Sequence, residues 1–295
     1  MFFAEFKDYL LLEKKYAKHT VTAYLKDLES FSDFLNAEQY HTKVSEVNYS
    51  QIRSWIVLMV NTGLSNRSIN RKISSLNTYF KYLMKIEQVS TNPLSSHKAL
   101  KTEKKVQIPF SQKEVETALN EIAFENSFEG LRDRLIIELL YATGMRRSEL
   151  INLKLSDVDL ESDILKVLGK RNKERYIPLI ASVKENLKTY LVYRSQITDA
   201  VNNQFLFLSL KGHQFSESQV YNTVKKCFSL VTSKVKKSPH MLRHSFATHM
   251  LNEGANLNAV KELLGHTSLA ATQVYTHSSI AELKKIYQAA HPRNK

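Results

Sequence analysis

The sequence predicts a mainly α-helical protein with a small antiparallel β-sheet in its C-terminal half. Apolar residues recur at spacings of three and four through most of the chain, as in helices that bury one face. Residues 158–179 instead have strand character, with a polar turn at 169–174. A polar, lysine-rich stretch at 95–108 separates an all-helical first part from this mixed second part. We therefore expect two domains.

Three apolar stripes with helical spacing occupy the first hundred residues. Thr20 is a candidate N-cap of the first helix, Gly63 a candidate C-cap of the second, and Ser65 opens the third. The stripes consist of Leu10, Tyr16, Val21, Tyr24, Leu25, Leu28, Phe31, Phe34 and Leu35, then Ile52, Trp55, Ile56 and Met59, then Ile69, Ile73, Leu76, Tyr79, Phe80 and Leu83. These side chains are expected to form the core of a helical domain at 1–94.

The second domain is predicted at 109–295, after a basic linker at 95–108. Ser111 with Glu114 has the spacing of a capping box, which indicates a new helix. Two short strands within 158–168 and a third at 175–179 form the expected sheet. Further helices are expected at 183–193, 217–231, 240–253, 257–264 and 280–289.

The composition favours an anionic partner. Lys and Arg number 42 against 29 Asp and Glu, which gives a formal net charge of +13. Such an excess suits nucleic acid or an acidic membrane surface. The single cysteine, Cys227, excludes a disulfide framework and a cysteine-based zinc site within one chain. No apolar run approaches the roughly 20 residues of a membrane helix, and no signal peptide is recognisable, so we expect a cytoplasmic protein.

Two polar clusters in the second domain could bind an anion. Arg146 follows Gly144 at the start of a helix, where a guanidinium can hold an anion beside helix amides. A surface arginine, or one paired with Glu149, is the alternative. The turn at 169–175 presents four cations, and Lys170 there could also donate a proton. Simple solvated charge is the alternative for this turn.

Two further clusters lie near the C-terminus. His240 and Arg243 fall one helical turn apart after Pro239, and His240 with His244 has a possible but weakly supported metal-ligand spacing. His266 follows a helix that ends at Gly265, and Tyr275 comes nine residues later. A packing role is the alternative for this tyrosine. Each of the four clusters is unspecific when taken alone.

Together and in this order, the clusters resemble the tyrosine recombinase family, and most closely its Xer type, which resolves chromosome dimers in bacteria. The resemblance covers nearly the whole chain, including Thr20, Tyr24 and Phe31 in the helical N-terminal part. The matching boxes are Thr143-Gly144-Met145-Arg146, the hairpin Lys170, His240-Met241-Leu242-Arg243-His244, Leu264-Gly265-His266 and Thr272-Gln273-Val274-Tyr275-Thr276-His277. Arg171 stands where a glycine is common in this family.

The resemblance implies a two-domain DNA clamp, in which a SAM-like domain that binds the core DNA site precedes the catalytic domain. It implies DNA strand exchange with Tyr275 as nucleophile, Arg146 and Arg243 neutralising the phosphate, and Lys170 protonating the leaving 5′ oxygen. His240 would accept or relay the tyrosine proton, and His266 would donate a hydrogen bond to the phosphate. Two arginines can neutralise a phosphate without a metal, so no cofactor and no metal are expected.

Further basic residues are candidates for contacts with double-stranded DNA at a specific recombination site. They are Arg67, Arg71 and Lys72 on one helix, Lys101, Lys104 and Lys105 in the linker, and Lys173 and Arg175 in the hairpin. A solvated basic face is the alternative for the first three. The amphipathic segment 280–290 either packs on its own domain or, as the resemblance favours, serves as an exchange helix that docks onto a neighbouring protomer.

The expected assembly is a tetramer on DNA, formed by identical chains or together with a sister Xer recombinase. A DNA translocase of the FtsK type is a possible activator. Other functions remain open within the same residue pattern. They are an integrase of a phage or mobile element, a type IB topoisomerase and a catalytically inactive DNA-binding regulator. A membrane-surface binder is disfavoured because no long apolar face carries a matched basic face.

Overall fold

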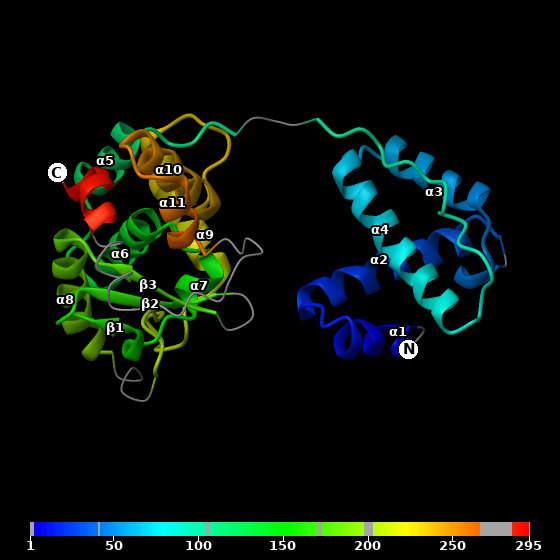
Figure 1. Ribbon diagram of the computed structural model, residues 1–295, viewed down its shortest axis with the longest axis horizontal. Helices are drawn as coiled ribbons and strands as arrows, with labels where there is room; N and C mark the ends of the chain where they lie inside the picture. The colour runs from blue at the N-terminus through cyan, green and yellow to red at the C-terminus, as the bar shows by residue number, and fades with distance from the viewer. Residues whose placement is uncertain are drawn as a thin grey trace. The chain divides into compact units, whose positions relative to one another are not determined.

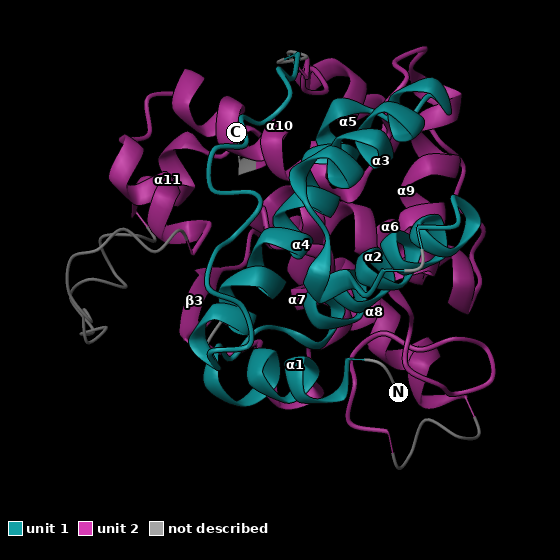
Figure 2. Ribbon diagram, turned by 90° about the vertical axis from the view of Figure 1, so that its right-hand side faces the viewer, with its two compact units in different colours: residues 1–106 teal, residues 107–295 magenta. Residues whose placement is uncertain are grey.

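In a computed structural model, the protein consists of two compact units, residues 1–106 and 107–295 (Figure 2). The structure describes residues 3–40, 42–103, 107–169, 173–197, 203–265 and 285–294. Each unit has its own core of buried apolar side chains. The predicted fold class, mainly helical with a small sheet in the second unit, is confirmed.

The N-terminal unit is all-helical within its described residues (Figure 1). Its elements are α1 (Ala4–Asp8), the π-helical turn η1 (Tyr9–Glu13), α2 (Lys18–Ala37), the 3-10 turn η2 (Val44–Glu46), α3 (Tyr49–Asn61) and α4 (Asn66–Lys85). The predicted stripes supply most of the core, in which the rings of Phe31 and Trp55 lie 4.7 Å apart. Gly63 follows α3 with a φ of +78°, a conformation that glycine adopts without strain, as its predicted capping role requires.

Two helix starts in this unit differ from expectation. Thr20 lies inside the first turn of α2, and the N-cap position is Ala17, which has no side-chain capping bond. Just before this helix, the ring of Tyr16 packs edge-on against Tyr24 of its second turn. The start of α3 carries an unpredicted capping box between Asn48 and Gln51.

The C-terminal unit surrounds the central helix α6 (Phe128–Thr143), which is buried on almost every face. The other helices are α5 (Gln112–Asn120), α7 (Arg147–Ile151), α8 (Ala181–Ser195), α9 (Glu217–Val231), α10 (Pro239–Asn252) and α11 (Leu257–Leu263), with the 3-10 turns η3 (Leu155–Asp157) and η6 (Pro292–Asn294). Helices α8, α9 and α10 all pack against α6. The predicted capping box of Ser111 and Glu114 is confirmed at the start of α5.

The sheet has three antiparallel strands in the order β1 (Val158–Asp159), β2 (Ile164–Leu168) and β3 (Glu174–Pro178). Its central pairing places Val167 opposite Arg175 and Lys166 opposite Tyr176. The hairpin closes through the Gly169 N–H, which donates to the Lys173 carbonyl at 2.7 Å. Because side chains alternate along β3, Arg175 and Ile177 share the buried face.

The end of the chain packs on the C-terminal unit itself. Residues 285–290 are helical, and the buried Tyr287 hydroxyl donates to the Ala142 carbonyl at 2.8 Å. Arg293 pairs with the fully buried Glu138 of α6 at 2.8 Å. This is the intramolecular alternative for the segment 280–290, whose first five residues lie outside the described part. Docking onto a neighbouring protomer stays a prediction.

Candidate functional site

Gly144 ends α6 and brings Arg146 to the start of α7. Gly144 has a φ of +59°, and a Cβ at this position would lie 2.3 Å from the Phe246 ring and 2.8 Å from the Leu264 side chain. Only glycine fits this turn without displacing both neighbours. The tight turn therefore lies against Phe246 of α10 and Leu264 just after α11, and Arg146 follows it two residues later.

Arg146 is half-exposed and held by Glu149. Its backbone N–H donates to Glu149 Oε2 at 2.8 Å, and its Nη1 donates to Oε1 at 2.7 Å. The Arg146 side chain is 42% exposed, whereas that of Glu149 is 5% exposed. The pairing that the sequence left open as an alternative thus exists, but it orients the guanidinium at the surface without covering it.

Arg243 projects from α10 into the interior. Its Nη1 donates to the Gly144 carbonyl and its Nη2 to the Leu264 carbonyl, both at 2.7 Å. Burial, together with the charge of Arg146, lowers the pKa of Arg243 to about 10. The group is still protonated near pH 7. It joins α10 both to the turn before Arg146 and to the chain just before Gly265.

His240 is an exposed residue in the first turn of α10, one turn before Arg243. Partial burial lowers the pKa of His240, and the charges of Arg243, His244, Lys236 and Arg146 lower it further. The imidazole is therefore largely neutral near pH 7 and can accept a proton. Lys236 was not among the predicted site residues, although its place four residues before His240 in a lysine-rich loop could have indicated it.

Three predicted catalytic residues, Lys170, His266 and Tyr275, lie outside the described residues, as do Lys104 and Lys105. Their neighbours in the sequence are described. The structure therefore brings together Arg146, Arg243 and His240, and it describes Gly169 and Gly265, which directly precede Lys170 and His266 in the chain.

The basic residues proposed for DNA contact divide into exposed and buried ones. Arg67, Lys101 and Lys173 are exposed. Lys101 belongs to a stretch that is fastened to α4, because its carbonyl accepts from Asn66 Nδ2 at 2.8 Å. The neighbouring Leu100 exchanges two hydrogen bonds of 2.8 Å with Asn70. The first part of the predicted linker thus packs on the N-terminal unit.

Arg71 and Lys72 share the buried Asp27 as a partner. Arg71 pairs with Asp27 while its side chain stays 48% exposed, so it can still reach an anion. Lys72 lies 3.5 Å from Asp27, is 16% exposed and sits over the Trp55 ring. Lys72 is therefore a poor candidate for a DNA contact. Asp27 was missed, although it falls on the buried stripe of α2 between Tyr24 and Phe31.

Arg175 does not face solvent. Its side chain is 5% exposed, its Nη2 donates to Glu149 Oε2 at 2.7 Å, and its Nε donates to the Leu263 carbonyl at 2.8 Å. The DNA contact expected of Arg175 stays a prediction, but the structure directs this guanidinium into the unit and bonds two of its nitrogens to protein acceptors. The physical reason is strand alternation, which places Arg175 on the same face as Ile177.

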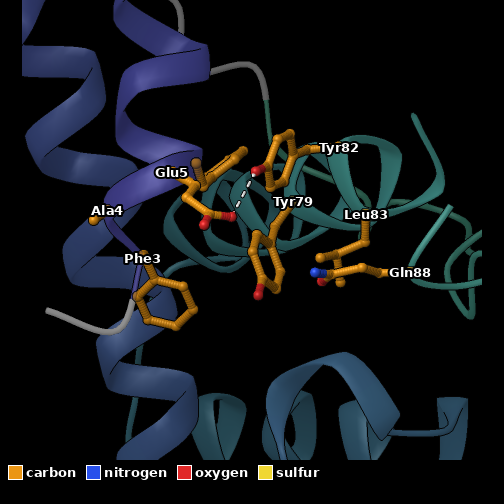
Figure 3. A pocket seen from close by; sticks show the side chains of 8 residues that line it. Phe3, Ala4, Glu5, Tyr79, Tyr82, Leu83 and Gln88 are labelled. Atoms are coloured by element: carbon orange, nitrogen blue, oxygen red, sulfur yellow. Dashed lines mark hydrogen bonds between the residues drawn. The ribbon is translucent and has the colours of Figure 1, made fainter. Parts of the chain in front are cut away.

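A pocket of about 280 Å³ in the N-terminal unit is unrelated to this cluster. It is lined by aromatic rings of α1 and α4 around Glu5, whose carboxylate accepts from the Tyr82 hydroxyl (Figure 3). None of the predicted site residues lines it. Within the described residues, no group of three His, Cys, Asp or Glu side chains is placed to hold a metal, and no helix is long and apolar enough to cross a membrane.

Comparisons with known proteins match each of the two units to a family model. The family described as "Phage integrase family" matches residues 110–282, and "Phage integrase, N-terminal SAM-like domain" matches residues 3–87. The tyrosine recombinase XerC of Staphylococcus aureus strain JH9 is 38% identical over 290 residues, which is 98% of this chain and 96% of that protein.

Solved structures of recombinases have a fold similar to that of this chain. The XerH site-specific recombinase bound to difH substrate in a pre-cleavage complex aligns with a TM-score of 0.70 and 26% identity, over 90% of this chain and 79% of that one. The integrase of the Tn1549 transposon in complex with transposon right-end DNA shares the fold, with a TM-score of 0.70 and 22% identity, over 95% and 98% of the two chains.

Proposed function

This chain belongs to the phage integrase family and is a Xer-type tyrosine recombinase, a DNA strand-exchange enzyme, and from this premise we propose the reaction and the residues that perform it. The enzyme cuts and rejoins double-stranded DNA at a specific site through a 3′-phosphotyrosine intermediate. Its cellular role is the resolution of chromosome dimers at cell division. The similarity in sequence to a XerC protein along nearly the whole chain supports this role over that of a phage or mobile-element integrase.

The observation that carries the chemical proposal is the grouping of Arg146 and Arg243 beside a neutral His240. The two arginines are close enough for the charge of Arg146 to lower the pKa of Arg243. Attack on a phosphodiester builds negative charge on the non-bridging oxygens, and two guanidiniums fixed by protein acceptors can stabilise that charge without reorganising.

The remaining steps use residues assigned by the family resemblance. The Tyr275 oxygen attacks phosphorus, its proton passes to His240, and the bond from phosphorus to the 5′ oxygen breaks. Lys170 protonates that oxygen, and His266 donates a hydrogen bond to the phosphate. The phosphotyrosine conserves the energy of the broken bond, so the 5′ hydroxyl of another strand can displace the tyrosine without ATP.

Binding is proposed to use both units and a tetramer on two duplexes, with a sister recombinase as a possible partner and a translocase as a possible activator. Arg67, Arg71, Lys101 and Lys173 are the described basic residues that remain available to phosphates, and Lys104 and Lys105 complete the proposed set. The complex of XerH with its difH substrate supports DNA as the ligand of this family.

The first experiment uses a nicked suicide substrate that carries the candidate dimer-resolution site of the host chromosome. Wild type should form a protein–DNA adduct that resists SDS, and Tyr275→Phe should bind the same DNA without forming it. The reaction is run with and without the sister recombinase. A wild type that binds the site but yields no adduct in either reaction, or an adduct that persists in Tyr275→Phe, would contradict the proposal.

A further inference from the structure

Arg175 is a buried arginine at the meeting point of three chain segments. It lies on β3 opposite Val167, and its side chain crosses from the hairpin to the start of α7 and the end of α11. Burial of an arginine is costly unless its donors find acceptors, so the contacts of Arg175 determine what it does.

The first contact is with the carboxylate that holds Arg146. Arg175 Nη2 donates to Glu149 Oε2 at 2.7 Å, and this same oxygen accepts the Arg146 backbone N–H at 2.8 Å. The other oxygen, Oε1, accepts from Arg146 Nη1 at 2.7 Å. Both oxygens of Glu149 are therefore occupied. The carboxylate lies between a fixed, buried guanidinium and a half-exposed one.

The second contact fixes the end of α11. Arg175 Nε donates to the Leu263 carbonyl at 2.8 Å, while the next carbonyl, that of Leu264, accepts from Arg243. Gly265 follows with a φ of +62°, and a Cβ there would lie 3.1 Å from Arg175 Nη1. The guanidinium thus packs against the backbone that immediately precedes His266.

The third contact is with the hairpin that contains Lys170. Arg175 is two residues after Lys173, whose carbonyl closes the hairpin by accepting from the Gly169 N–H. The position of a Cβ on Gly169 would be 3.6 Å from Arg175 Nη1 and 3.8 Å from Glu149 Oε1. The last described residue before Lys170 therefore lies over the ion pair of Arg175 and Glu149.

We propose that Arg175 is a positioning residue for strand cleavage, which orients Arg146 through Glu149 and holds the hairpin and the end of α11 in register with it. This inference rests on the proposed function, because it concerns the efficiency of that reaction. It replaces the role in DNA binding that the sequence suggested for Arg175.

A lysine at position 175 should not be able to perform this positioning role. The planar guanidinium directs Nη2 to a carboxylate and Nε to a carbonyl at the same time, in a fixed fork. A single ammonium on a flexible chain keeps the charge but cannot reproduce both directions. Arg175→Lys therefore separates charge neutralisation from positioning.

The experiment measures the rate of adduct formation with the suicide substrate at saturating full-length protein, and DNA affinity separately. Arg175→Lys should slow adduct formation by roughly 100-fold, the size expected when a catalytic group is misplaced by about 1 Å, with affinity changed less than about threefold.

The matched control is Arg194→Lys. Arg194 is also a buried arginine of this unit, bonded to the carbonyls of Asn203, Phe205 and Leu206, and it belongs to no part of the site. This control should lower the melting temperature but keep the cleavage rate of folded protein within about threefold.

A double-mutant cycle tests the route through Glu149. Arg175→Met leaves the buried Glu149 carboxylate with only the half-exposed Arg146 as its ionic partner, and adding Glu149→Gln removes this poorly compensated charge and should restore thermal stability. Cleavage should remain low in the double variant, and no lower than in the worse single variant. Recovery of cleavage together with stability would overturn the positioning role, as would equal losses for Arg175→Lys and Arg194→Lys.

The two proposals fail in different ways. Wild type that binds the site without forming an adduct would refute the proposed cleavage, and the positioning role with it. An active wild type with an equally active Arg175→Lys would refute the positioning role alone.

Discussion

Asp27 in the N-terminal unit and Glu149 in the C-terminal unit solve a similar problem in different settings. Each buried carboxylate binds one half-exposed arginine and one largely buried cation, Arg71 with Lys72 in the first case and Arg146 with Arg175 in the second. Asp27 joins two long helices, α2 and α4, and also accepts from the Ser75 hydroxyl at 2.7 Å. Glu149 joins a five-residue helix to Arg175 of a strand, and Arg175 in turn bonds to the end of another helix.

The difference lies in what each carboxylate organises. Long helices with a shared apolar face remain packed without one polar contact, so Asp27 mainly sets the direction of a basic helix face. The segments around Glu149 also bury apolar side chains such as Leu150 and Ile177, but they are short, so we expect their relative placement to depend more on the polar network. We therefore expect changes around Asp27 to alter stability and DNA affinity, and changes around Glu149 to alter cleavage.

The largest effect is expected from Arg146→Ala. Removal of Arg146, the half-exposed one of the two guanidiniums proposed to stabilise the transition state, should lower the rate of adduct formation by roughly 100- to 1,000-fold, with DNA affinity changed only a few-fold. Arg147→Ala is the matched control, since this adjacent arginine pairs with Glu217 at the surface. A loss of affinity that accounts for the whole loss of cleavage would make Arg146 only a DNA anchor.

Asp27→Ala should have the next largest effect, on stability. Lys72 would be left unpaired while it is mostly buried over Trp55, and Arg71 would lose its orientation. We expect a loss of about 3 kcal/mol in the free energy of unfolding, measured by urea denaturation, and weaker DNA binding. Asp33→Ala, at an exposed position of the same helix, should change neither the free energy of unfolding nor the DNA affinity. Unaltered affinity in Asp27→Ala would restrict this cluster to a role in folding.

Arg67→Ala and Lys72→Ala should behave differently in salt titrations of DNA binding. Arg67 is exposed, so its loss should reduce the slope of log affinity against log salt by about 1. Lys72 is held by Asp27, so its loss should leave the slope nearly unchanged and lower stability instead. Equal slopes for the two variants would remove the distinction between exposed and buried cations on α4.

The smallest effect is expected at Glu114, a carboxylate at the start of the C-terminal unit. Burial opposes its ionisation, but hydrogen bonds from Lys234, Thr232 and the Ser111 N–H outweigh this and lower the pKa of Glu114 to about 2. Because the folded pKa is below the ordinary value of 4.5, the stabilisation is present above pH 4.5 and is lost as the pH falls toward 2.

Glu114→Gln should therefore cost about 1 kcal/mol at pH 7 and almost nothing near pH 2, as measured by denaturation at several pH values. Glu116→Gln, an exposed neighbour on the same helix, is the control. A constant difference between Glu114→Gln and wild type at all pH values would contradict the assigned pKa.

Much of the fold was predictable because it depends on local periodicity. The apolar stripes of α2, α3 and α4, the capping box at Ser111 and the glycine that ends α6 each report a backbone requirement within a few residues. Thr20 is not the cap, because the helix already begins at Lys18 and Thr20 lies within its first turn. Choosing between two possible caps depends on where the preceding chain packs.

The sequence predicted which residues form the candidate site and their order along the chain, but not the hydrogen bonds and ion pairs that hold them. Arg146, His240 and Arg243 were found from their places in the sequence, and the structure describes them in one unit with mutual electrostatic influence. The inward direction of Arg175 followed from the alternation of β3, which was available in the sequence. The hydrogen-bond partners of Arg175 could not be predicted from the sequence, because Glu149 is 26 residues away and Leu263 is 88 residues away.

The sequence by itself determined the helical class, the small sheet, the basic charge and the order of the polar clusters, since periodicity and composition act over short distances. The tertiary structure decided which cations are free to meet DNA and which serve the interior. That choice depends on whether a buried carboxylate or carbonyl from a distant segment lies within hydrogen-bonding reach. Asp27 retains Lys72 and Glu149 retains Arg175 for this reason, while Arg71 and Arg146 keep half of their surface in water.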